Sequence, residues 1–394
     1  MKNRFSPYLM LVAVIVISLI GGENRMHRSV QALRPPVATN LSANGNNNSI
    51  CWTREAVDEI PKVGTHTSLA LDSNGRPHIS YYDESNGNLK YVRWQDTGWQ
   101  IEVVDSAEDV GKYTMLALNS NDQARISYFD EANDNLKYAQ WNGAGWQIET
   151  VDSAGNVGQY AAMALDSNGR PHISYYDGSP NYDLKYAHWN GASWQVESIT
   201  SGSGVKGQHT SIAVDSNGRP HISYRNLSDS ELRYARWNGA TWQIETVDSN
   251  GNVGWYTSLA LDSNNYPLIS YQITGTSYDL KFAQWDGAMW QIETVDSTDF
   301  VGAYSSLVLD SNGYPHISYH VDSPDYDLKY AHWNGAAWQI ETVDRHDVWD
   351  VGSYTSLALD DNDLPHISYY DDSNNDLKYA HLWPYCVNLP LITH

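Results

Sequence analysis

One unit of about 48 residues recurs along most of the chain, and this repeat limits the possible folds more than any other feature. Each copy is marked by a Trp that begins a segment resembling WQIETVD. The seven markers, spaced 47 or 48 residues apart, are Trp52, Trp99, Trp146, Trp194, Trp242, Trp290 and Trp338. A fixed period of this length indicates a repeat architecture, in which each unit buries its apolar surface against its neighbours.

Each unit contains four short segments with strand character. In the second unit these are WQIEVVD (99–105), TMLALN (114–119), RISYFD (125–130) and LKYAQW (136–141). Turn sequences such as SNG and NGA separate them, and Asn and Gly readily adopt the positive φ of tight hairpins. Because no helical period is present, four antiparallel strands repeated seven times predict an all-β fold, a seven-bladed β-propeller.

The two ends of the repeat predict how the ring closes. We name the strands of one blade A (TSLALD type), B (HISYYD), C (LKYAHW) and D (WQIETVD), from the channel outward. The first copy begins with a D strand at Trp52, whereas the last copy stops after a C strand at 377–382. The N-terminal D strand is therefore expected to complete the last blade.

The two cysteines of the chain, Cys51 and Cys386, lie where this closure is expected. Their positions correspond to the C–D hairpin of an ordinary blade. We predict a disulfide that replaces the missing covalent connection, as suits an exported protein. In the chain-entropy model such a bridge stabilises by about 5 kcal/mol. Two unrelated buried thiols are the alternative.

The N-terminal segment has the layout of an export signal. Lys2 and Arg4 precede an apolar run at 8–20, which is short for a membrane span. We predict a signal peptide at 1–32, with an uncleaved anchor as the alternative and the only route to a membrane. Residues 33–50 are expected to be a flexible linker, 51–388 the propeller and 389–394 a tail. The protein is then secreted or displayed on the extracytoplasmic cell surface.

The charge of the chain narrows its partners. It has 24 Lys and Arg against 47 Asp and Glu, a net charge of -23. Such a surface repels phosphate backbones, so nucleic acid is not an expected partner. Neutral sugars, cations and basic partners remain open, and we expect a monomer.

Metal and cofactor sites are not expected. The turn Asp72-Ser73-Asn74-Gly75 has oxygen ligands for calcium, but Arg76 and Pro77 stand where more carboxylates would be needed. An Asx-stabilised hairpin turn is the preferred interpretation. Five histidines at one repeat position lie on different blades, so we expect buried polar packing rather than a metal cluster: His78, His172, His221, His316 and His366.

Aromatic residues fall into a regular set and a few exceptions. The Trp residues that begin D strands and end C strands, and the Tyr of each ISY, are expected to pack between blades. The D–A connections carry an aromatic or imidazole side chain two residues after the Gly of VG, which predicts a ring at the channel mouth. Its members are His66, Tyr113, Tyr160, His209, Tyr256, Tyr304 and Tyr354.

One arc of the ring departs from the repeat. Three D–A connections carry an additional aromatic residue: Trp255, Phe300 and Trp349. In the same region the strand-B ends change from aromatic to Arg225, Gln272 and His320. We predict a ligand site here, formed by these six residues with Tyr256, Tyr304 and Tyr354. Exposed aromatics beside carboxylates suit sugar or peptide recognition, and loop packing is the alternative.

The blade pattern ISYYDESNGNLKYVRWQDTGW (79–99) resembles the repeats of propeller lectins. These include Aleuria-type fucose-binding lectins and bangle lectins, and the resemblance extends from 51 to about 383. It also resembles exported bacterial propellers of amplified repeats. Fucose-binding members use an Arg on strand B and a Glu on strand C, whereas ISYY and LKY stand here. The resemblance implies glycan binding but does not support fucose specificity.

Sialidase-like hydrolases are the enzyme alternative, because that class also uses propellers. Their Asp-box, Ser-x-Asp-x-Gly-x-x-Trp, is not found, and the arginines form no evident triad. A nucleophile elbow, a phosphate loop and an HExxH motif are also missing. We interpret the repeated D-strand glutamates as solvated edge charges far from the channel: Glu102, Glu149, Glu197, Glu245, Glu293 and Glu341.

These observations favour an exported, non-enzymatic recognition module that binds glycans multivalently through one face. A protein-binding surface or adhesion scaffold is the alternative. Seven near-copies fit a ring of similar sites better than one catalytic centre.

Overall fold

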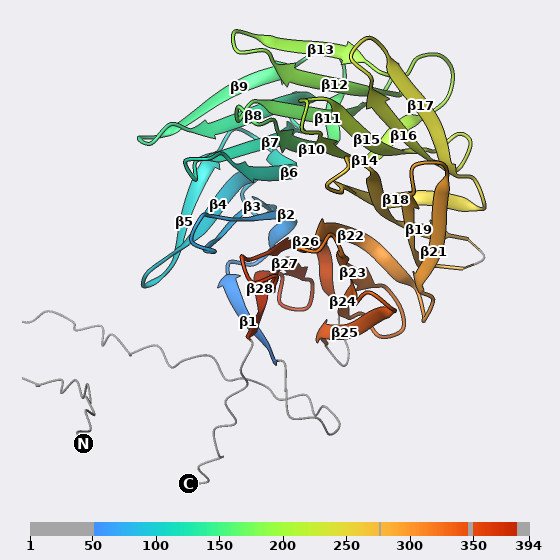
Figure 1. Cartoon of the computed structure of the whole chain (residues 1–394). Helices are drawn as coiled ribbons and strands as arrows, with labels where there is room; N and C mark the ends of the chain where they lie inside the picture. The colour runs from blue at the N-terminus through green and yellow to red at the C-terminus, as the bar shows by residue number, and fades with distance from the viewer. Residues whose placement is uncertain (1–50, 276, 346–349, 384–394) are drawn as a thin grey trace, which may run out of the picture. The chain divides into compact units, whose positions relative to one another are not determined.

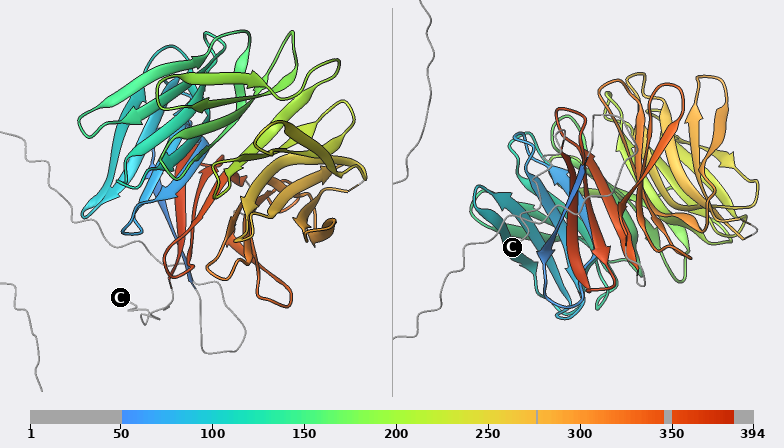
Figure 2. Two further views of the ribbon diagram at one scale, coloured as in Figure 1. Left: turned by 45° about the horizontal axis from the view of Figure 1, so that its top comes forward. Right: turned by 90° about the horizontal axis from the view of Figure 1, so that it is seen from below.

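Seven separate four-stranded antiparallel sheets surround a central channel (Figure 1). The computed structural model describes residues 51–275, 277–345 and 350–383, which form 28 strands. In six sheets the strand order follows the chain, from A at the channel to D at the rim, and in the seventh the D strand is the N-terminal β1. The predicted seven-bladed β-propeller is confirmed, and Figure 2 shows the sheets from two further directions.

The strands occupy equivalent positions in every blade. The A strands are β2 (Val63–Leu71), β6 (Val110–Leu118), β10 (Val157–Leu165), β14 (Lys206–Val214), β18 (Asn252–Leu261), β22 (Val301–Leu309) and β26 (Val351–Leu359). The B strands are β3 (Pro77–Asp83), β7 (Ala124–Asp130), β11 (Pro171–Asp177), β15 (Pro220–Asn226), β19 (Pro267–Thr274), β23 (Pro315–Val321) and β27 (Pro365–Asp371). The C strands are β4 (Asn88–Gln95), β8 (Asn135–Trp141), β12 (Asp183–Trp189), β16 (Glu231–Trp237), β20 (Asp279–Trp285), β24 (Leu328–Trp333) and β28 (Asp376–Trp383). The D strands are β5 (Gly98–Asp105), β9 (Trp146–Asp152), β13 (Trp194–Ser198), β17 (Trp242–Asp248), β21 (Trp290–Asp296), β25 (Trp338–Asp344) and β1 (Cys51–Asp58).

We number the blades 1 to 7, beginning with β2–β5, so that blade 7 combines β26, β27 and β28 with the N-terminal β1. Strand β1 pairs antiparallel with β28, with Trp52 opposite Leu382 and Cys51 opposite Trp383. Figure 1 shows the blue β1 beside the red β28. The predicted closure of the ring is confirmed. Cys386 lies outside the described residues, so the disulfide stays a prediction.

The expected signal peptide, linker and C-terminal tail also lie outside the described residues. Within residues 51–275, 277–345 and 350–383 there is no helix with the length and apolarity to span a bilayer. Export and anchoring therefore remain predictions from the sequence.

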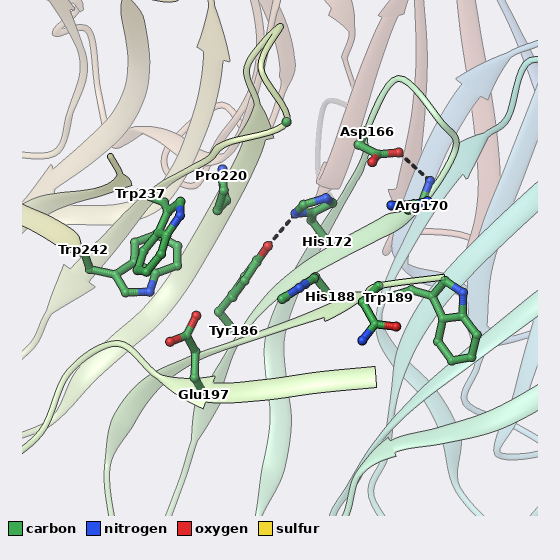
Figure 3. A pocket seen from close by; sticks show the side chains of 12 residues that line it. Asp166, Arg170, His172, Tyr186, His188, Trp189, Glu197, Pro220, Trp237 and Trp242 are labelled. Carbon is green, nitrogen blue, oxygen red and sulfur yellow. Dashed lines mark hydrogen bonds between the residues drawn. The ribbon is translucent and has the colours of Figure 1, made fainter. Parts of the chain in front are cut away.

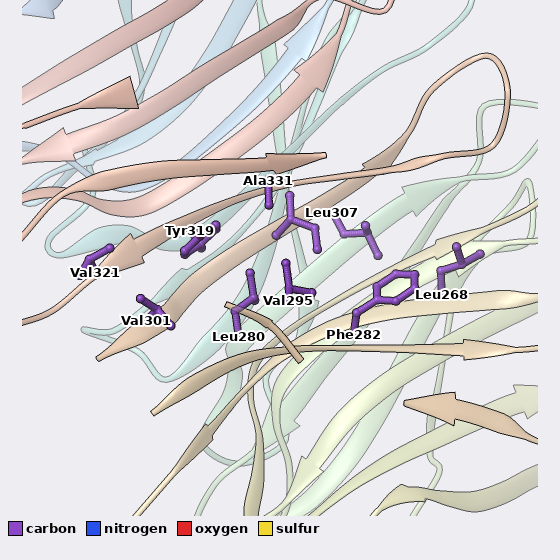
Figure 4. Packing of buried hydrophobic residues seen from close by; sticks show 10 residues of the cluster. Leu268, Leu280, Phe282, Val295, Val301, Leu307, Tyr319, Val321 and Ala331 are labelled. Carbon is purple, nitrogen blue, oxygen red and sulfur yellow. The ribbon is translucent and has the colours of Figure 1, made fainter. Parts of the chain in front are cut away.

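The hydrophobic core lies between successive blades. Between blades 5 and 6, for example, Leu280 and Phe282 of β20 pack against Val301, Leu307 and Tyr319 of the next blade (Figure 4). Equivalent clusters recur around the ring, because both faces of each sheet are covered by a neighbour. Each interface thus contributes apolar burial of similar size.

The Gly of each VG pair permits this close packing. A Cβ on Gly158 would lie 2.9 Å from Cα of Leu136 in the preceding blade, and its φ is +113°. Both the space and the backbone conformation exclude a larger residue. The repeated VG therefore fixes the approach of one A strand to its neighbour's C strand.

Polar contacts tie the blades together as well. At six interfaces the Tyr of ISY donates a 2.7 Å hydrogen bond to the Asp that ends the D strand of the preceding blade. Between blades 2 and 3, for example, Tyr175 donates to Asp152, which also accepts 2.5 Å from Lys185. Tyr224, between blades 3 and 4, has no such partner because Thr200 stands in place of the Asp. The interface between blades 3 and 4 is therefore the one without this Tyr–Asp hydrogen bond.

Candidate functional sites

Seven aromatic and imidazole side chains close the central channel. Neighbouring ring centroids are 4.5 to 4.9 Å apart all the way around. Each of these residues has φ between 49° and 54°, which a β-bulge in the A strand imposes. The predicted ring is confirmed, and its members are His66, Tyr113, Tyr160, His209, Tyr256, Tyr304 and Tyr354.

This ring is uncharged near neutral pH. Burial lowers the pKa of His66 and of His209 to about 3, and burial raises the pKa of Tyr256 to about 12. The cavity at the axis holds only about 170 Å³, below the range typical of small-molecule sites. The channel is thus a narrow, neutral cavity.

The structure brings the predicted arc together only in part. Tyr256, Tyr304 and Tyr354 belong to the channel ring, and the Arg225 guanidinium lies 4.0 Å from the ring centroid of Trp255. Phe300 is exposed and packs against Tyr278, with ring centroids 4.6 Å apart. Trp349 lies outside the described residues.

The three altered strand-B ends are buried rather than displayed at the rim: Arg225, Gln272 and His320. Nε2 of Gln272 donates to the Val301 carbonyl at 2.8 Å. His320 lies between Asp350, 2.5 Å from Nε2, and Asp322, 3.2 Å from Nδ1. Burial opposes protonation, but these two carboxylates outweigh it and raise the pKa of His320 to about 9.

Larger cavities lie on the opposite face, where A–B turns and C–D hairpins meet between neighbouring blades. They hold about 390 Å³ between blades 3 and 4 and about 380 Å³ between blades 4 and 5. Those between blades 1 and 2 and between blades 2 and 3 hold about 240 and 250 Å³. The two larger cavities reach the size of small-molecule sites.

The cavity between blades 3 and 4, which we call the 3/4 pocket, mixes aromatic and polar groups. His172, Tyr186 and His188 of blade 3 face Trp237 and Trp242 of blade 4 (Figure 3). The Tyr186 hydroxyl lies 2.5 Å from Nδ1 of His172. Burial lowers the pKa of His172 to about 4, so this imidazole is neutral at pH 7.

The turn above the pocket is held by a carboxylate. Oδ1 of Asp166 accepts 2.8 Å hydrogen bonds from the backbone N–H groups of Asn168 and Arg170. The same geometry at Asp72 confirms that DSNG forms an Asx-stabilised turn.

Within the described parts of the chain, no three His, Cys, Asp or Glu side chains are grouped as a metal site requires.

Five of the six D-strand glutamates are more than solvated edge charges: Glu293 is exposed, as interpreted, but the other four are half-buried, and all five are bonded. Their carboxylates accept hydrogen bonds of 3.0 to 3.2 Å from a Trp indole N–H of the next blade or, in one case, of β1. These residues are Glu102, Glu149, Glu245, Glu293 and Glu341. They bridge the interfaces because the D-strand Trp folds back over the neighbouring blade.

Glu197 is the exception. Trp242 Nε1, its expected partner, is buried without a hydrogen-bond partner, and Glu197 is exposed at the pocket. Strand β13 is only 5 residues long and reads WQVES where other blades have WQIETVD. The 3/4 interface thus lacks both the Tyr–Asp bond and the Glu–Trp bond, which leaves polar groups facing the 3/4 pocket.

Sequence reasoning missed this pocket, because Trp237, Trp242 and Glu197 occupy repeated positions and were assigned to packing or to the edge. A usable signal was the sequence WQVESIT at 194–200. In this sequence Thr200 replaces the Asp that accepts the tyrosine hydrogen bond at the other interfaces, so Tyr224 has no such acceptor.

Comparison with known proteins supports the fold. No protein-family model and no curated protein matches this chain. A mutant Aleuria aurantia lectin in complex with Fucα1-6GlcNAc is 14% identical, with a TM-score of 0.50 over 73% of this chain and 97% of that chain. AofleA from Arthrobotrys oligospora is 12% identical, with a TM-score of 0.50 over 76% and 91%.

A polysaccharide lyase is also similar. An ulvan lyase bound to -[GlcA(1-4)Rha3S]- is 13% identical, with a TM-score of 0.61 over 82% of this chain and 94% of that chain. At these identities the likeness is one of fold: the chain resembles propeller lectins and a propeller lyase.

Proposed function

We propose that this protein binds carbohydrate through the pockets between its blades, with the 3/4 pocket as the principal site. The observation that carries this proposal is the loss of two inter-blade hydrogen bonds at the 3/4 interface, which borders one of the two larger inter-blade pockets. Because packing does not require Glu197 and the Trp242 indole N–H to pair there, both groups are available to a ligand.

The chemistry of the 3/4 pocket suits a sugar. Tyr186, Trp237 and Trp242 present aromatic surface to the apolar face of a pyranose ring. Glu197 accepts hydrogen bonds from sugar hydroxyls, and neutral His188 has an unpaired buried Nδ1. A few placed polar groups in an otherwise aromatic pocket are typical of small-molecule recognition.

Related pockets between other blades support multivalent binding. They share the Asx turn and a Trp that ends a C strand, but at all three of their interfaces the D-strand Glu is already paired with an indole N–H. Weak sites on one rigid ring gain avidity without a tight individual pocket. Export through the N-terminal signal would place this ring among extracellular glycans.

The solved structures add support by analogy. A similar propeller was captured with Fucα1-6GlcNAc and another with an ulvan fragment. Binding of carbohydrate is common to both, whereas cleavage belongs only to the lyase. We therefore propose binding rather than catalysis, as a lectin-like module.

A glycan array tests the proposal. Residues 33–394 should bind a saccharide that free sugar competes, and Trp242→Ala should lower this binding at least tenfold. Trp338→Ala, at the same repeat position but outside the four pockets, is the matched control and should bind normally.

The alternatives give other results. A blank array at high protein concentration contradicts carbohydrate binding and favours a protein-binding scaffold. Release of unsaturated uronic-acid products from a polysaccharide would instead identify a lyase.

A further inference from the structure

Arg225, at the end of β15, is buried without a counter-ion. Its side chain is 1% exposed, and Nη2 donates to Oδ1 of Asn252 at 2.6 Å. Nε and Nη1 have no hydrogen-bond partner, and no described carboxylate forms an ion pair with the guanidinium. A buried cation with two free donors is costly unless a further acceptor reaches it.

Equivalent positions in other blades show what is missing. In two other blades the residue equivalent to Arg225 meets a carboxylate just before strand A of the next blade. The Tyr82 hydroxyl donates to Asp109 at 2.5 Å, and His320 meets Asp350 at 2.5 Å. Arg225 meets an amide instead, so this chain places a carboxylate opposite its buried His but not opposite its buried Arg.

Asn252 is held in this role by its own partner. Its Nδ2 donates to Oγ1 of Thr274 at 2.6 Å, which turns Oδ1 toward Arg225. One acceptor oxygen therefore satisfies one of the guanidinium nitrogens, and the other two remain for something else.

Two more buried nitrogen atoms lie beside the guanidinium. The ring of Trp255 covers Arg225, and Nε1 of Trp255 has no hydrogen-bond partner. The His209 ring lies next to Trp255, with ring centroids 5.2 Å apart, and Nε2 of His209 also has no partner. Burial first, and then the charge of Arg225, hold the pKa of His209 near 3, so the imidazole is neutral and can donate from Nε2. Three residues thus carry unpaired nitrogen atoms in one contiguous cluster.

One acidic position of the repeat is neutral in the blades of this arc. Strand B ends in Asp in blades 1, 2, 3 and 7, but in blades 4 to 6 the corresponding residues are Asn226, Ile273 and Val321. The net charge of -23 repels anions at long range, so a local reduction matters for an acidic ligand.

We propose that Arg225, Trp255 and His209 form an oxyanion site for a carboxylate or sulfate group of the ligand. The guanidinium Nε and Nη1 supply a charge-assisted pair of donors, and the indole and imidazole N–H groups supply the others. Trp255 is partly exposed at the rim, and its side chain swings to admit the anion. This site lies on the D–A face, opposite the 3/4 pocket, and therefore adds a second, separate site to the proposed function, one for an acidic group of a glycan. It rests on that function only for the molecule that carries the oxyanion.

Simple anions test the site without knowledge of the ligand. Sulfate and acetate are titrated into the protein by calorimetry, and thermal unfolding is followed against chloride at equal ionic strength. The wild type should bind at millimolar concentrations. Arg225→Gln should bind at least tenfold more weakly, and so should Arg225→Tyr, which gives blade 4 the residue of blades 1, 3 and 7. Lys62→Gln removes one positive charge from an exposed position that lines none of the pockets described and should bind like the wild type.

Asn252→Asp is the most specific variant, because it supplies the absent counter-ion from within. It should raise the thermal midpoint in chloride and abolish sulfate binding. Sulfate stabilises most proteins nonspecifically, so the difference between variants is the readout. Equal sulfate binding by wild type, Arg225→Gln and Asn252→Asp would overturn the site, as would a wild type that binds neither anion.

Two sugar pairs identify the source of the oxyanion: a uronate disaccharide with its carboxyl-reduced form, and a sulfated disaccharide with its desulfated form. Stronger binding of one charged member, lost in Asn252→Asp, assigns the carboxylate or the sulfate. If inorganic sulfate binds through Arg225 but no saccharide does, the site stands and carbohydrate binding fails.

Discussion

The two interfaces of blade 3 differ although both are built from nearly the same repeat. Toward blade 2, Asp152 accepts from Tyr175 and Lys185, and Glu149 accepts from the Trp194 indole at 3.2 Å. Toward blade 4, Thr200 replaces the Asp and neither hydrogen bond forms. The cavities also differ, at about 250 and about 390 Å³. The missing hydrogen bonds do not set this size, because the interface between blades 4 and 5 keeps both bonds beside a cavity of about 380 Å³.

This difference suggests how a repeat protein acquires a site. Every interface buries a similar apolar cluster, so the ring closes even when some polar contacts are missing. Polar groups that no longer bridge two blades become available to a ligand. The 3/4 interface is then less stable than the others at the place where we propose the binding pocket, a trade-off often found at functional sites.

The largest effect is expected from breaking the regular interface. Asp152→Ala leaves the Tyr175 hydroxyl and the Lys185 ammonium buried without their acceptor, so the free energy of unfolding should fall by about 3 kcal/mol. Chemical denaturation measures this change. Asp96→Ala removes a carboxylate whose side chain is 96% exposed and should have no effect. Equal effects of the two variants would refute the role of Asp152.

The second-largest effect is expected from lowering the pH, which should reduce the unfolding free energy through His172 at the 3/4 interface. Burial lowers the pKa of His172 to about 4, below its value near 6.5 in the unfolded chain. Its contribution is intact above pH 6.5 and is lost as the pH falls toward 4, by about 2 kcal/mol at pH 5. His172→Gln should therefore lose about that much less stability than the wild type between pH 7 and pH 5.

Arg125 takes the place of His172 at the interface between blades 2 and 3 and serves as the control. Arg125→Gln should leave the pH dependence unchanged. An identical loss of stability in His172→Gln and wild type would contradict the assignment of a neutral His172.

A smaller effect is expected from the glutamates. Glu149→Ala removes the hydrogen bond from Trp194 and should cost about 1 kcal/mol of unfolding free energy. Glu197→Ala should cost almost nothing, because Glu197 accepts no indole hydrogen bond. A comparable loss from both substitutions, measured by urea denaturation, would show that the 3/4 interface is not open.

The smallest effect is a gain. Six blades carry Thr or Ser after the channel-ring residue, as in the Thr114–Ser80 bond of 2.9 Å, but blade 3 has Ala161 and leaves Ser127 Oγ unpaired. Ala161→Thr should supply this bond and stabilise by about 1 kcal/mol. Ala161→Val, similar in shape but without the hydroxyl, should give no such gain in the same thermal unfolding experiment.

The sequence predicted the fold because each level of the pattern agreed with the others. Strand alternation, Asn-Gly turns and the Trp period required four-stranded blades, and the D strand at Trp52 required closure by β1. The channel ring was also predictable, since it depends on one position of each A strand. These features follow from local pattern and counting.

The candidate sites were harder to predict, because they depend on partners in neighbouring blades. Arg225 and Trp255 were singled out as deviations, yet only the structure shows that they stack and that Asn252 faces the guanidinium. Glu197 and Trp242 follow the repeat in sequence and differ only in what they contact. The sequence does not show that an atom lacks a hydrogen-bond partner, because the partner would come from the neighbouring blade.

One titration decides whether the 3/4 pocket binds carbohydrate. The best glycan from the array is titrated into wild type, Glu197→Ala and Glu293→Ala; the last alters the same repeat position outside the four pockets. If the 3/4 pocket binds the glycan, Glu197→Ala should bind it at least tenfold more weakly and Glu293→Ala should bind it like the wild type. Unchanged binding by Glu197→Ala would contradict it.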